Sequence, residues 1–404
     1  RMLDMGVERF VDRQFESWPE LVDPIGLLPP LLLRGWITLP LLNMLGSIDS
    51  LMQSFFQDER LRAIFTFQTL YVGLTPYNSP GALCLLAGTD LTDGVWYPEG
   101  GWRGVRNSLV DLAKKYGVKL NTKADVDEVI VEGGEARGIR MASGEEMRAD
   151  VVVVNQDLPR AYRTLLRNAD ASLRPDQKEA SPTPVDDFAE DWGAKDYSCG
   201  VIAFYWAVNT KVGYLGHHSI FLGAGADAKA GAASWEPITS PGGMPRNPNF
   251  YVHCPSRTDP STCPDGCESV MVLFPVANMQ EMEKLAGRKP TGTKGELYAD
   301  IKAAARETIL RRFREAGCGD IADNIVEEFV RDPEDFEELY GLEHGATFSL
   351  SHGLLQLAMT RPPPRSAEVE KLFFVGAGTR PGNGVPLVLM GAGLTSEQIL
   401  EDIG

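Results

Sequence analysis

The residues best suited to chemistry lie in a glycine-rich turn near the end of the chain. A short apolar run at residues 371–375 is followed by the sequence GAGTRPGNG at residues 376–384, and a helical pattern covers residues 385–400. Glycine lets a backbone approach a ligand closely, and the free N–H groups that begin a helix favour negative charge. Pro386 suits the first helical turn because it has no N–H to lose. The pattern predicts either a ligand-binding turn or a plain strand-to-helix connection without a ligand.

A second candidate turn is the sequence WYPEGG at residues 96–101, before a helical pattern marked by Val105, Leu109 and Leu112. It indicates either a ligand-facing turn or an ordinary entry into a helix. Cys263 and Cys267 have a spacing that metal ligands use, but the Pro-Asp-Gly between them is typical of a turn, and we predict no metal site.

The composition of the chain restricts the classes of partner that it can bind. The chain has 404 residues, 43% of them hydrophobic, which is enough for more than one core. The excess of 56 acidic over 39 basic residues gives a net charge of −17, which repels phosphate backbones and anionic lipid. We predict no nucleic-acid partner, and any membrane contact must come from apolar surface.

The elements that must position the two turns are those of an α/β protein. Residues 96–164 carry a helix and then an apolar pattern typical of part of a nucleotide-binding domain, with strands predicted around residues 118–121, 126–132, 136–141 and 151–154. Residues 165–362 indicate a second domain, with strands at 199–208 and 269–276, a helix at 294–316 and a mobile loop at 223–249.

Residues 1–95 are predicted to be largely helical, with helical patterns at residues 3–20 and 48–72. The apolar stretch at residues 21–45 is too broken by prolines to span a membrane as one helix. It indicates either an element that dips into the lipid interface or a set of short helices that covers the core.

Several stretches together resemble a known family. Residues 374–386, with the sequence FVGAGTRPGNGVP, are similar to the C-terminal flavin-binding signature of bacterial and fungal phytoene desaturases. Further similar stretches follow the order of that family and lie at residues 65–68, 75–81, 96–101, 250–261 and 352–365. The resemblance covers the chain from about residue 48 to its end.

The resemblance implies an α/β fold with three parts. These are a Rossmann-like FAD-binding domain of the glutathione-reductase type, a β-sheet substrate domain and a helical membrane-facing segment. The helical segment would comprise residues 1–95, the substrate domain residues 165–362, and the FAD-binding domain residues 96–164 and 363–404. A Gly-x-Gly-x-x-Gly motif for the FAD pyrophosphate does not occur, so we expect that the chain is truncated at its N-terminus and binds FAD poorly as given.

The resemblance also implies site residues. Those expected to hold FAD are Val126 at the adenine, Gly376, Ala377 and Gly378 along the ribityl and phosphate part, and Gly384, Val385 and Pro386 at the edge of the flavin ring. Those expected on the substrate side of the ring are Tyr97, Gly100 and Gly101. Arg380 stands where the family usually has histidine, and no residue is assigned a catalytic role. Arg257, Arg361 and Arg365 are expected to be structural hydrogen-bond donors.

A member of this family would bind FAD non-covalently and take a membrane-dissolved polyene, removing hydride to the flavin in a dry channel. Candidates for the channel wall are Phe204, Tyr205 and Trp206, and strand alternation lets only some of them face it. Quinone or oxygen would accept the electrons. The protein would associate peripherally with a membrane, in a plastid if the source is a photosynthetic eukaryote, and its oligomeric state is open. The alternatives are a carotene isomerase or saturase on the same fold and a non-catalytic lipid-binding relative.

Overall fold

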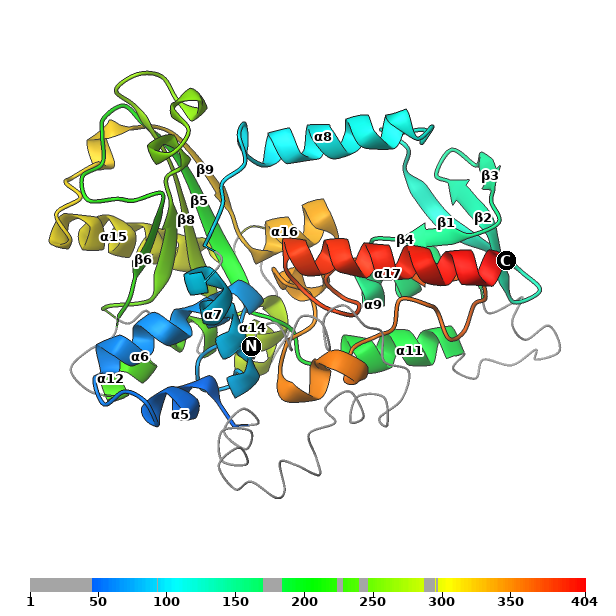
Figure 1. Ribbon diagram of the computed structural model, residues 1–404, viewed down its shortest axis with the longest axis horizontal. Coiled ribbons are helices and arrows are strands. Elements are labelled where there is room, and N and C mark those ends of the chain that lie inside the picture. Colours follow the sequence, from blue (N-terminus) through cyan, green and yellow to red (C-terminus); the bar gives the residue numbers. More distant parts are fainter. Residues whose placement is uncertain are drawn as a thin grey trace.

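The computed structural model describes residues 46–92, 94–169, 184–223, 228–239, 246–286, 295 and 297–404. The helix predicted at residues 3–20 and the apolar stretch at residues 21–45 lie outside these ranges. The described chain is a mixed α/β protein in which helices flank three sheets (Figure 1). None of the helices in the described ranges has the length and apolar character needed to cross a membrane.

The largest sheet has five antiparallel strands in the order β6-β7-β8-β5-β9. Their bounds are β5 Gly200–Val208, β6 His218–Phe221, β7 Phe250–His253, β8 Glu268–Val276 and β9 Ile325–Arg331. Alternate residues of β5 point to one face, where Phe204 and Trp206 are buried against helix α15 (Ala299–Glu315). Phe313 of α15 meets the Trp206 ring edge-on, with the ring centroids 6.2 Å apart.

Two smaller sheets lie at the other end of the molecule (Figure 1). Strands β1 (Val126–Glu132), β2 (Glu135–Met141) and β3 (Glu146–Arg148) are antiparallel. Strand β4 (Val152–Val154) pairs in parallel with β10 (Leu372–Phe374), which comes from near the end of the sequence. Because Val154 lies opposite Phe374, the segments that follow both strands leave the sheet side by side.

Helices α9 (Leu158–Leu165) and α11 (Pro184–Gly193) cover this parallel pair. The Tyr162 ring is stacked on both Phe188 of α11 and Phe374 of β10, with centroid distances of 4.1 and 5.3 Å. Stacked aromatic rings of this kind stabilise a core beyond the area that they bury. The result is a second hydrophobic core, distinct from the one between the large sheet and α15.

Other helices surround the sheets. Their bounds are α5 Ile48–Gln53, α6 Glu59–Thr66, α7 Cys84–Thr92, α8 Gly101–Lys115, α12 Ala228–Ala233, α13 Glu236–Thr239, α14 Met279–Ala286, α16 Pro333–Tyr340 and α17 Val385–Ile403. Short 3-10 turns lie at Phe67–Val72, Gly81–Leu83, Pro255–Arg257, Pro260–Thr262, Ala322–Asn324, Glu343–Gly345, Leu354–Gln356 and Ala358–Thr360. Local sequence explains the ends of α16, because Asp332 and Asp335 form a capping box and Gly341 takes a left-handed φ of 67°.

Two sequence predictions about elements are wrong. Residues 118–121 form no strand but an irregular connection between α8 and β1, and Val118 and Leu120 are about half exposed because no neighbouring strand pairs with them. The segment 223–249 is not simply a loop, since its described part contains α12 and α13. Its alanine-rich sequence favours helix, and Trp235 and Ile238 are buried.

Candidate functional site

The glycine-rich turn begins where the parallel strands β4 and β10 end. The Asn155 side chain, directly after β4, donates a hydrogen bond of 2.8 Å from Nδ2 to the carbonyl of Val375, directly after β10. Gly376 follows with a φ of 117°, and a Cβ atom there would lie 2.7 Å from Asn155 Nδ2. Only glycine fits this position, because the backbone angle and the close neighbour both exclude a side chain.

A buried carboxyl group supports the next part of the turn. Asp157 Oδ1 accepts a hydrogen bond from the Ser349 hydroxyl, and Asp157 Oδ2 accepts one of 2.9 Å from the backbone N–H of Glu343. A Cβ on Gly378 would lie 3.2 Å from Ser349 Oγ and 3.5 Å from Asp157 Oδ1, so the turn packs directly on this pair. Burial raises the pKa of Asp157 above its ordinary value, although both hydrogen bonds favour the ionised form.

Arg361 lies beneath the turn and is 1% exposed. Its guanidinium donates only to main-chain carbonyls, which belong to Leu350, Ser351, Gln356, Ala377 and Thr379. Burial lowers the pKa of Arg361 to about 10, which leaves it charged at neutral pH. The expectation of a structural donor is confirmed for Arg361, because it ties residues 377–379 to residues 350–356.

The other two arginines also make structural contacts. Arg257 donates to the carbonyl of Val212 and lies 3.4 Å from the Glu268 carboxylate. Arg365 pairs with Asp402 near the end of α17 at 2.6 Å. Neither contact places a guanidinium at the glycine-rich turn.

The N-terminus of α17 is the open end of the turn. Gly384 precedes the helix with a φ of 120°, and no side chain caps it. A Cβ on Gly384 would meet only Leu387 Cγ, at 4.0 Å, and Val385 and Pro386 are exposed. The first turn of α17 contains no acidic residue, and no side chain in the described part of the chain caps its free N–H groups, so the positive end of the helix dipole is not neutralised there.

The turn therefore suits a ligand that combines an extended polar chain with a ring able to take up negative charge. Gly376, Ala377 and Gly378 present backbone beside Asn155 and Asp157, and the start of α17 presents uncapped N–H groups. A flavin dinucleotide has both features, so the residues present fit FAD. The assignment of each residue to a part of FAD stays a prediction.

The structure places the second candidate turn elsewhere. Gly100 and Gly101 have left-handed backbones at the start of α8, and a Cβ on Gly101 would lie 2.7 Å from Tyr97 Oη. The Tyr97 ring packs on His217, with centroids 4.6 Å apart, at the edge of the five-stranded sheet. Figure 1 shows this end of α8 beside that sheet and apart from the first turn of α17. No described contact joins the Tyr97 turn to the glycine-rich turn.

Other predicted site residues are also placed by the fold. Val126 begins β1, half-buried and paired with Met141, at the far end of the connection from α8. Phe204 and Trp206 are buried in the core of the large sheet and cannot line a channel, whereas Tyr205 is 40% exposed on the other face. Strand alternation thus leaves only Tyr205 as a candidate for the channel wall.

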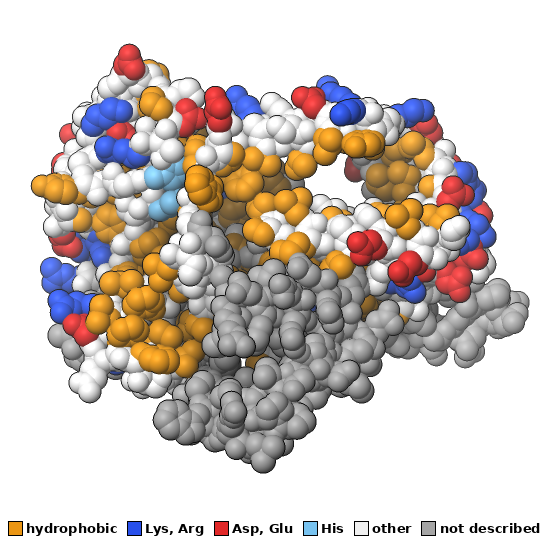
Figure 2. All heavy atoms as spheres, viewed as in Figure 1, with side chains coloured by type: hydrophobic (Ala, Val, Ile, Leu, Met, Phe, Trp, Pro, Cys, Tyr) orange, Lys and Arg blue, Asp and Glu red, His pale blue; other side chains and the backbone are white. Residues whose placement is uncertain are grey.

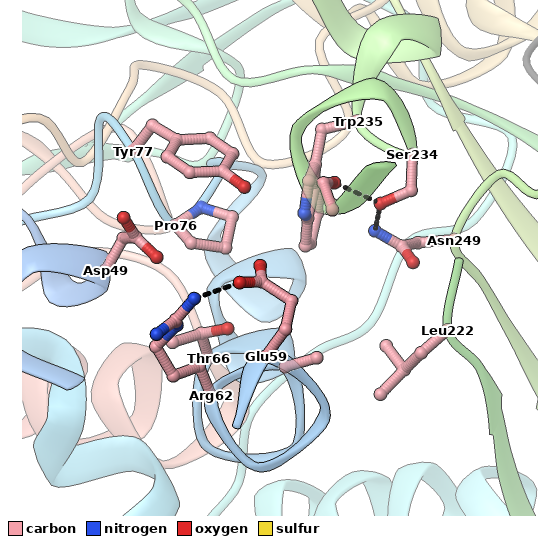
Figure 3. Close-up of a pocket in the computed structure, with 12 residues that line it drawn as sticks. Asp49, Glu59, Arg62, Thr66, Pro76, Tyr77, Leu222, Ser234, Trp235 and Asn249 are labelled. Carbon is pink, nitrogen blue, oxygen red and sulfur yellow. Dashed lines mark hydrogen bonds and ion pairs between the residues drawn. The ribbon is translucent and has the colours of Figure 1, made fainter. Parts of the chain in front are cut away.

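A small polar pocket lies between α6 and the α12–α13 segment (Figure 3). Arg62 and Glu59 form an ion pair on one side, and Asn249 donates to Ser234 Oγ at 2.9 Å on the other. Burial raises the pKa of Tyr77, which covers the pocket, to about 12. Charged walls do not suit a hydrocarbon, so this pocket is not the site expected for a polyene.

Sequence reasoning missed the residues that support the turn from other segments. Asn155 and Asp157 carried a usable signal, because polar residues directly after a buried strand often lie at a site. Ser349 carried none, and His352 begins the family-like stretch at residues 352–365 without an assigned role. Only the folded chain brings both side chains to the turn.

Comparisons with known proteins identify a family. Residues 41–184 match the family described as flavin containing amine oxidoreductase. The chain is 32% identical to the phytoene desaturase of Neurospora crassa, with 99% of this chain aligned to 62% of that protein. It is 34% identical to the zeta-carotene-forming phytoene desaturase of Myxococcus xanthus, with 86% of this chain aligned to 60% of that protein. The chain thus spans less than two thirds of the length of these two relatives.

Two further comparisons concern a bacterial relative and a solved structure. The chain is 30% identical to a 4,4'-diapophytoene desaturase of Staphylococcus haemolyticus, with 98% of this chain aligned to 72% of that protein. The crystal structure of an oxidoreductase from Methanosarcina mazei aligns with 87% of this chain and with 68% of its own chain. The TM-score is 0.56 and the identity is 15%, so this similarity shows the fold alone. The resemblance found in the sequence is confirmed: the chain belongs to the phytoene and carotenoid desaturase family of flavin-containing amine oxidoreductases.

Proposed function

We propose that the protein is an FAD-dependent oxidoreductase that desaturates a phytoene-like carotenoid precursor by hydride transfer to flavin. The observation that carries this proposal is the uncapped N-terminus of α17, which follows a glycine-rich turn held between the ends of two parallel strands. A bound flavin supplies the hydride acceptor. The positive end of α17 favours the negative charge that the ring gains on reduction.

The proposal assigns the binding of FAD to residues on both sides of the parallel pair. Gly376 to Gly378 would hold the ribityl and phosphate part, Gly384 to Pro386 the ring edge, and Val126 the adenine. The pairing of β4 with β10 supports placing residues 96–164 and 363–404 in one FAD-binding domain of Rossmann type. The separate core of the five-stranded sheet supports a substrate domain within residues 165–362.

Exposed apolar surface supports a polyene substrate, because a hydrocarbon offers no polar handle and is oriented by shape. Figure 2 shows an opening between α8 and α17 with hydrophobic side chains along its rims. Exposed apolar side chains on these two helices include Trp102, Leu109 and Leu112 of α8 and, at the start of α17, Val385 and Leu389. A substrate dissolved in lipid requires peripheral contact with a membrane surface, and quinone or oxygen would reoxidise the flavin.

Substrate conversion tests the proposal. The full-length protein, loaded with FAD, is incubated with phytoene in liposomes and a quinone, and the products are separated and identified by absorption. Desaturation extends the conjugated system and moves absorption to longer wavelength. Isomerisation would barely move it, saturation would move it to shorter wavelength, and unchanged phytoene would indicate a lipid-binding relative; each of these results contradicts the proposal.

A further inference from the structure

His352 lies directly under the glycine-rich turn. It is 3% exposed, and its Nε2 accepts a hydrogen bond of 3.0 Å from the backbone N–H of Asn383. A Cβ on Gly382 would lie 2.9 Å from His352 Nε2, so the ring packs on the turn itself. The Asn383 side chain donates to the carbonyl of Tyr71 at 2.8 Å, which fixes the other side of the segment that leads into α17.

The bond to Asn383 fixes the tautomer of the ring. An Nε2 atom that accepts a hydrogen bond cannot carry a proton, so the neutral imidazole carries its proton on Nδ1. Burial, together with the charge of Arg361, holds the pKa of His352 well below its ordinary value. The ring is therefore neutral at physiological pH, with one N–H donor at Nδ1.

This donor has no partner among the described residues. His352 Nδ1 is buried and makes no hydrogen bond in the described structure. Its buried neighbour Arg361 offers donors only, and these are directed at main-chain carbonyls. The nearby Ser351 hydroxyl accepts from the backbone N–H of Gly353. Buried polar groups nearly always have a partner, so an unpaired donor at a binding turn indicates an acceptor that the described residues do not supply.

We propose that His352 Nδ1–H donates a hydrogen bond to an acceptor atom of the bound flavin. The inference rests on the proposed function, because it takes the glycine-rich turn to be the flavin site. A polyene hydrocarbon has no acceptor, whereas a flavin carries carbonyl oxygens and ring nitrogens. The bond from Asn383 then acts as the positioning contact, since it selects the tautomer that can donate.

Two substitutions test the roles of the two ring nitrogens of His352 separately. The His352→Asn side chain places an amide N–H near the position of Nδ1 and leaves Asn383 without its acceptor. The His352→Gln side chain reaches the position of Nε2 with an amide oxygen, which keeps the bond to Asn383 and removes the donor at Nδ1. His217→Asn, at the edge of the large sheet, is the matched control outside the turn.

The measurements use the full-length protein. Titration with FAD, followed by flavin fluorescence, should show affinity reduced tenfold or more in His352→Gln and less than threefold in His352→Asn, with no change in His217→Asn. The flavin midpoint potential should fall in His352→Gln, because a donor that favours the reduced ring is lost. In the wild-type protein with 15N-labelled histidine, the His352 signal should show the Nδ1–H tautomer before FAD is added and a downfield shift of that proton afterwards.

Each outcome decides the matter. Unchanged affinity and potential in a folded His352→Gln protein would overturn the inference, as would equal losses in both variants, because ring packing would then explain them. If His352→Gln does not fold, the wild-type proton signal decides, and a signal unmoved by FAD would overturn the inference. A wild-type protein that binds no FAD would overturn the proposed function as well, whereas wild-type binding with an indifferent His352→Gln overturns the inference alone.

Discussion

The core between the five-stranded sheet and α15 buries its apolar residues more completely than the start of α17 does. At the five-stranded sheet, Phe204, Phe250 and Phe313 are at most 1% exposed, and the core closes between sheet and helix. At the glycine-rich turn, α17 leaves Val385 and Leu389 about half exposed. The same end contains a buried imidazole donor, His352 Nδ1, that has no partner in the described ranges, and a helix start that no described side chain caps.

This difference separates scaffold from site. The core residues between the large sheet and α15 pack against one another, so their substitution should change stability and leave ligand binding unchanged. Residues around the glycine-rich turn are arranged to contact a ligand, and their substitution should change ligand binding more than stability.

Phe313→Ala should destabilise the core between the five-stranded sheet and α15. Removing a fully buried aromatic ring should lower the free energy of unfolding by about 4 kcal/mol. Urea unfolding measures the change, with Phe329→Ala as the control, because Phe329 lies on β9 with 62% of its surface exposed and should change stability by less than about 0.5 kcal/mol. The folded Phe313→Ala protein should bind FAD with wild-type affinity, and a weaker affinity would contradict the separation of scaffold from site.

Arg361→Met should break the support of the turn. The substitution leaves buried carbonyls on both sides without donors and should reduce the free energy of unfolding by about 3 kcal/mol. Arg365→Met is the control, because its exposed pair with Asp402 contributes less than about 1 kcal/mol. Unlike Phe313→Ala, Arg361→Met should also weaken FAD binding, and equal affinities in the two variants would count against the account.

Gly384→Val tests whether the start of α17 faces the ligand. Valine is strained at a φ of 120°, so the first turn of α17 should shift and FAD affinity should fall about tenfold, which is about 1.4 kcal/mol. FAD titration measures the effect. An affinity within threefold of the wild-type value would show that the start of α17 does not face the ligand.

A pH change should affect the histidines at the edge of the five-stranded sheet. Burial and the neighbouring His217 and His218 lower the pKa of His253 from 6.5 to about 4, so the unfolded chain takes up a proton between these values and the folded chain does not. Stability from this group is present above pH 6.5 and is lost as the pH falls toward 4. After discounting for partial exposure we expect a loss of about 1 kcal/mol.

The measurement compares unfolding of the wild-type protein and His253→Gln at pH 7.5 and pH 5. The difference in stability between the two proteins should shrink at the lower pH. A difference that does not depend on pH would show that His253 titrates alike in the folded and unfolded chains.

Gly393→Ala should have the smallest effect and the opposite sign. Gly393 lies inside α17 with open space around the position of a Cβ atom, so alanine should raise the free energy of unfolding by about 0.5 to 1 kcal/mol. FAD affinity should stay unchanged, which makes Gly393→Ala a control for Gly384→Val on the same helix. A loss of affinity would mean that the middle of α17, rather than its start, contacts the ligand.

Local features of the site could be predicted from the sequence. The strand expected at residues 371–375 is β10 (Leu372–Phe374), and the helix expected from residue 385 is α17. Both could be predicted because apolar runs, glycines and Pro386 determine the local conformation of the backbone. The strands expected at residues 126–132 and 199–208 also agree closely with β1 and β5.

Contacts between distant segments could not be predicted. The position of Asn155 beside Val375 depends on the parallel pairing of β4 with β10, and no local pattern encodes a partner so far along the chain. The same limit explains why Phe204 and Trp206 were candidates for a channel wall, since alternation shows that two faces exist but not which one carries a helix. The strand expected at residues 118–121 failed because no partner strand lies beside it.

The absorption spectrum of the purified full-length protein tests the central claim most directly. The account predicts a yellow protein with stoichiometric FAD, and a Gly384→Val variant that loses the chromophore on dilution while its folded fraction is unchanged. A wild-type protein that stays colourless after addition of FAD would contradict the claim that the turn before α17 is a flavin site.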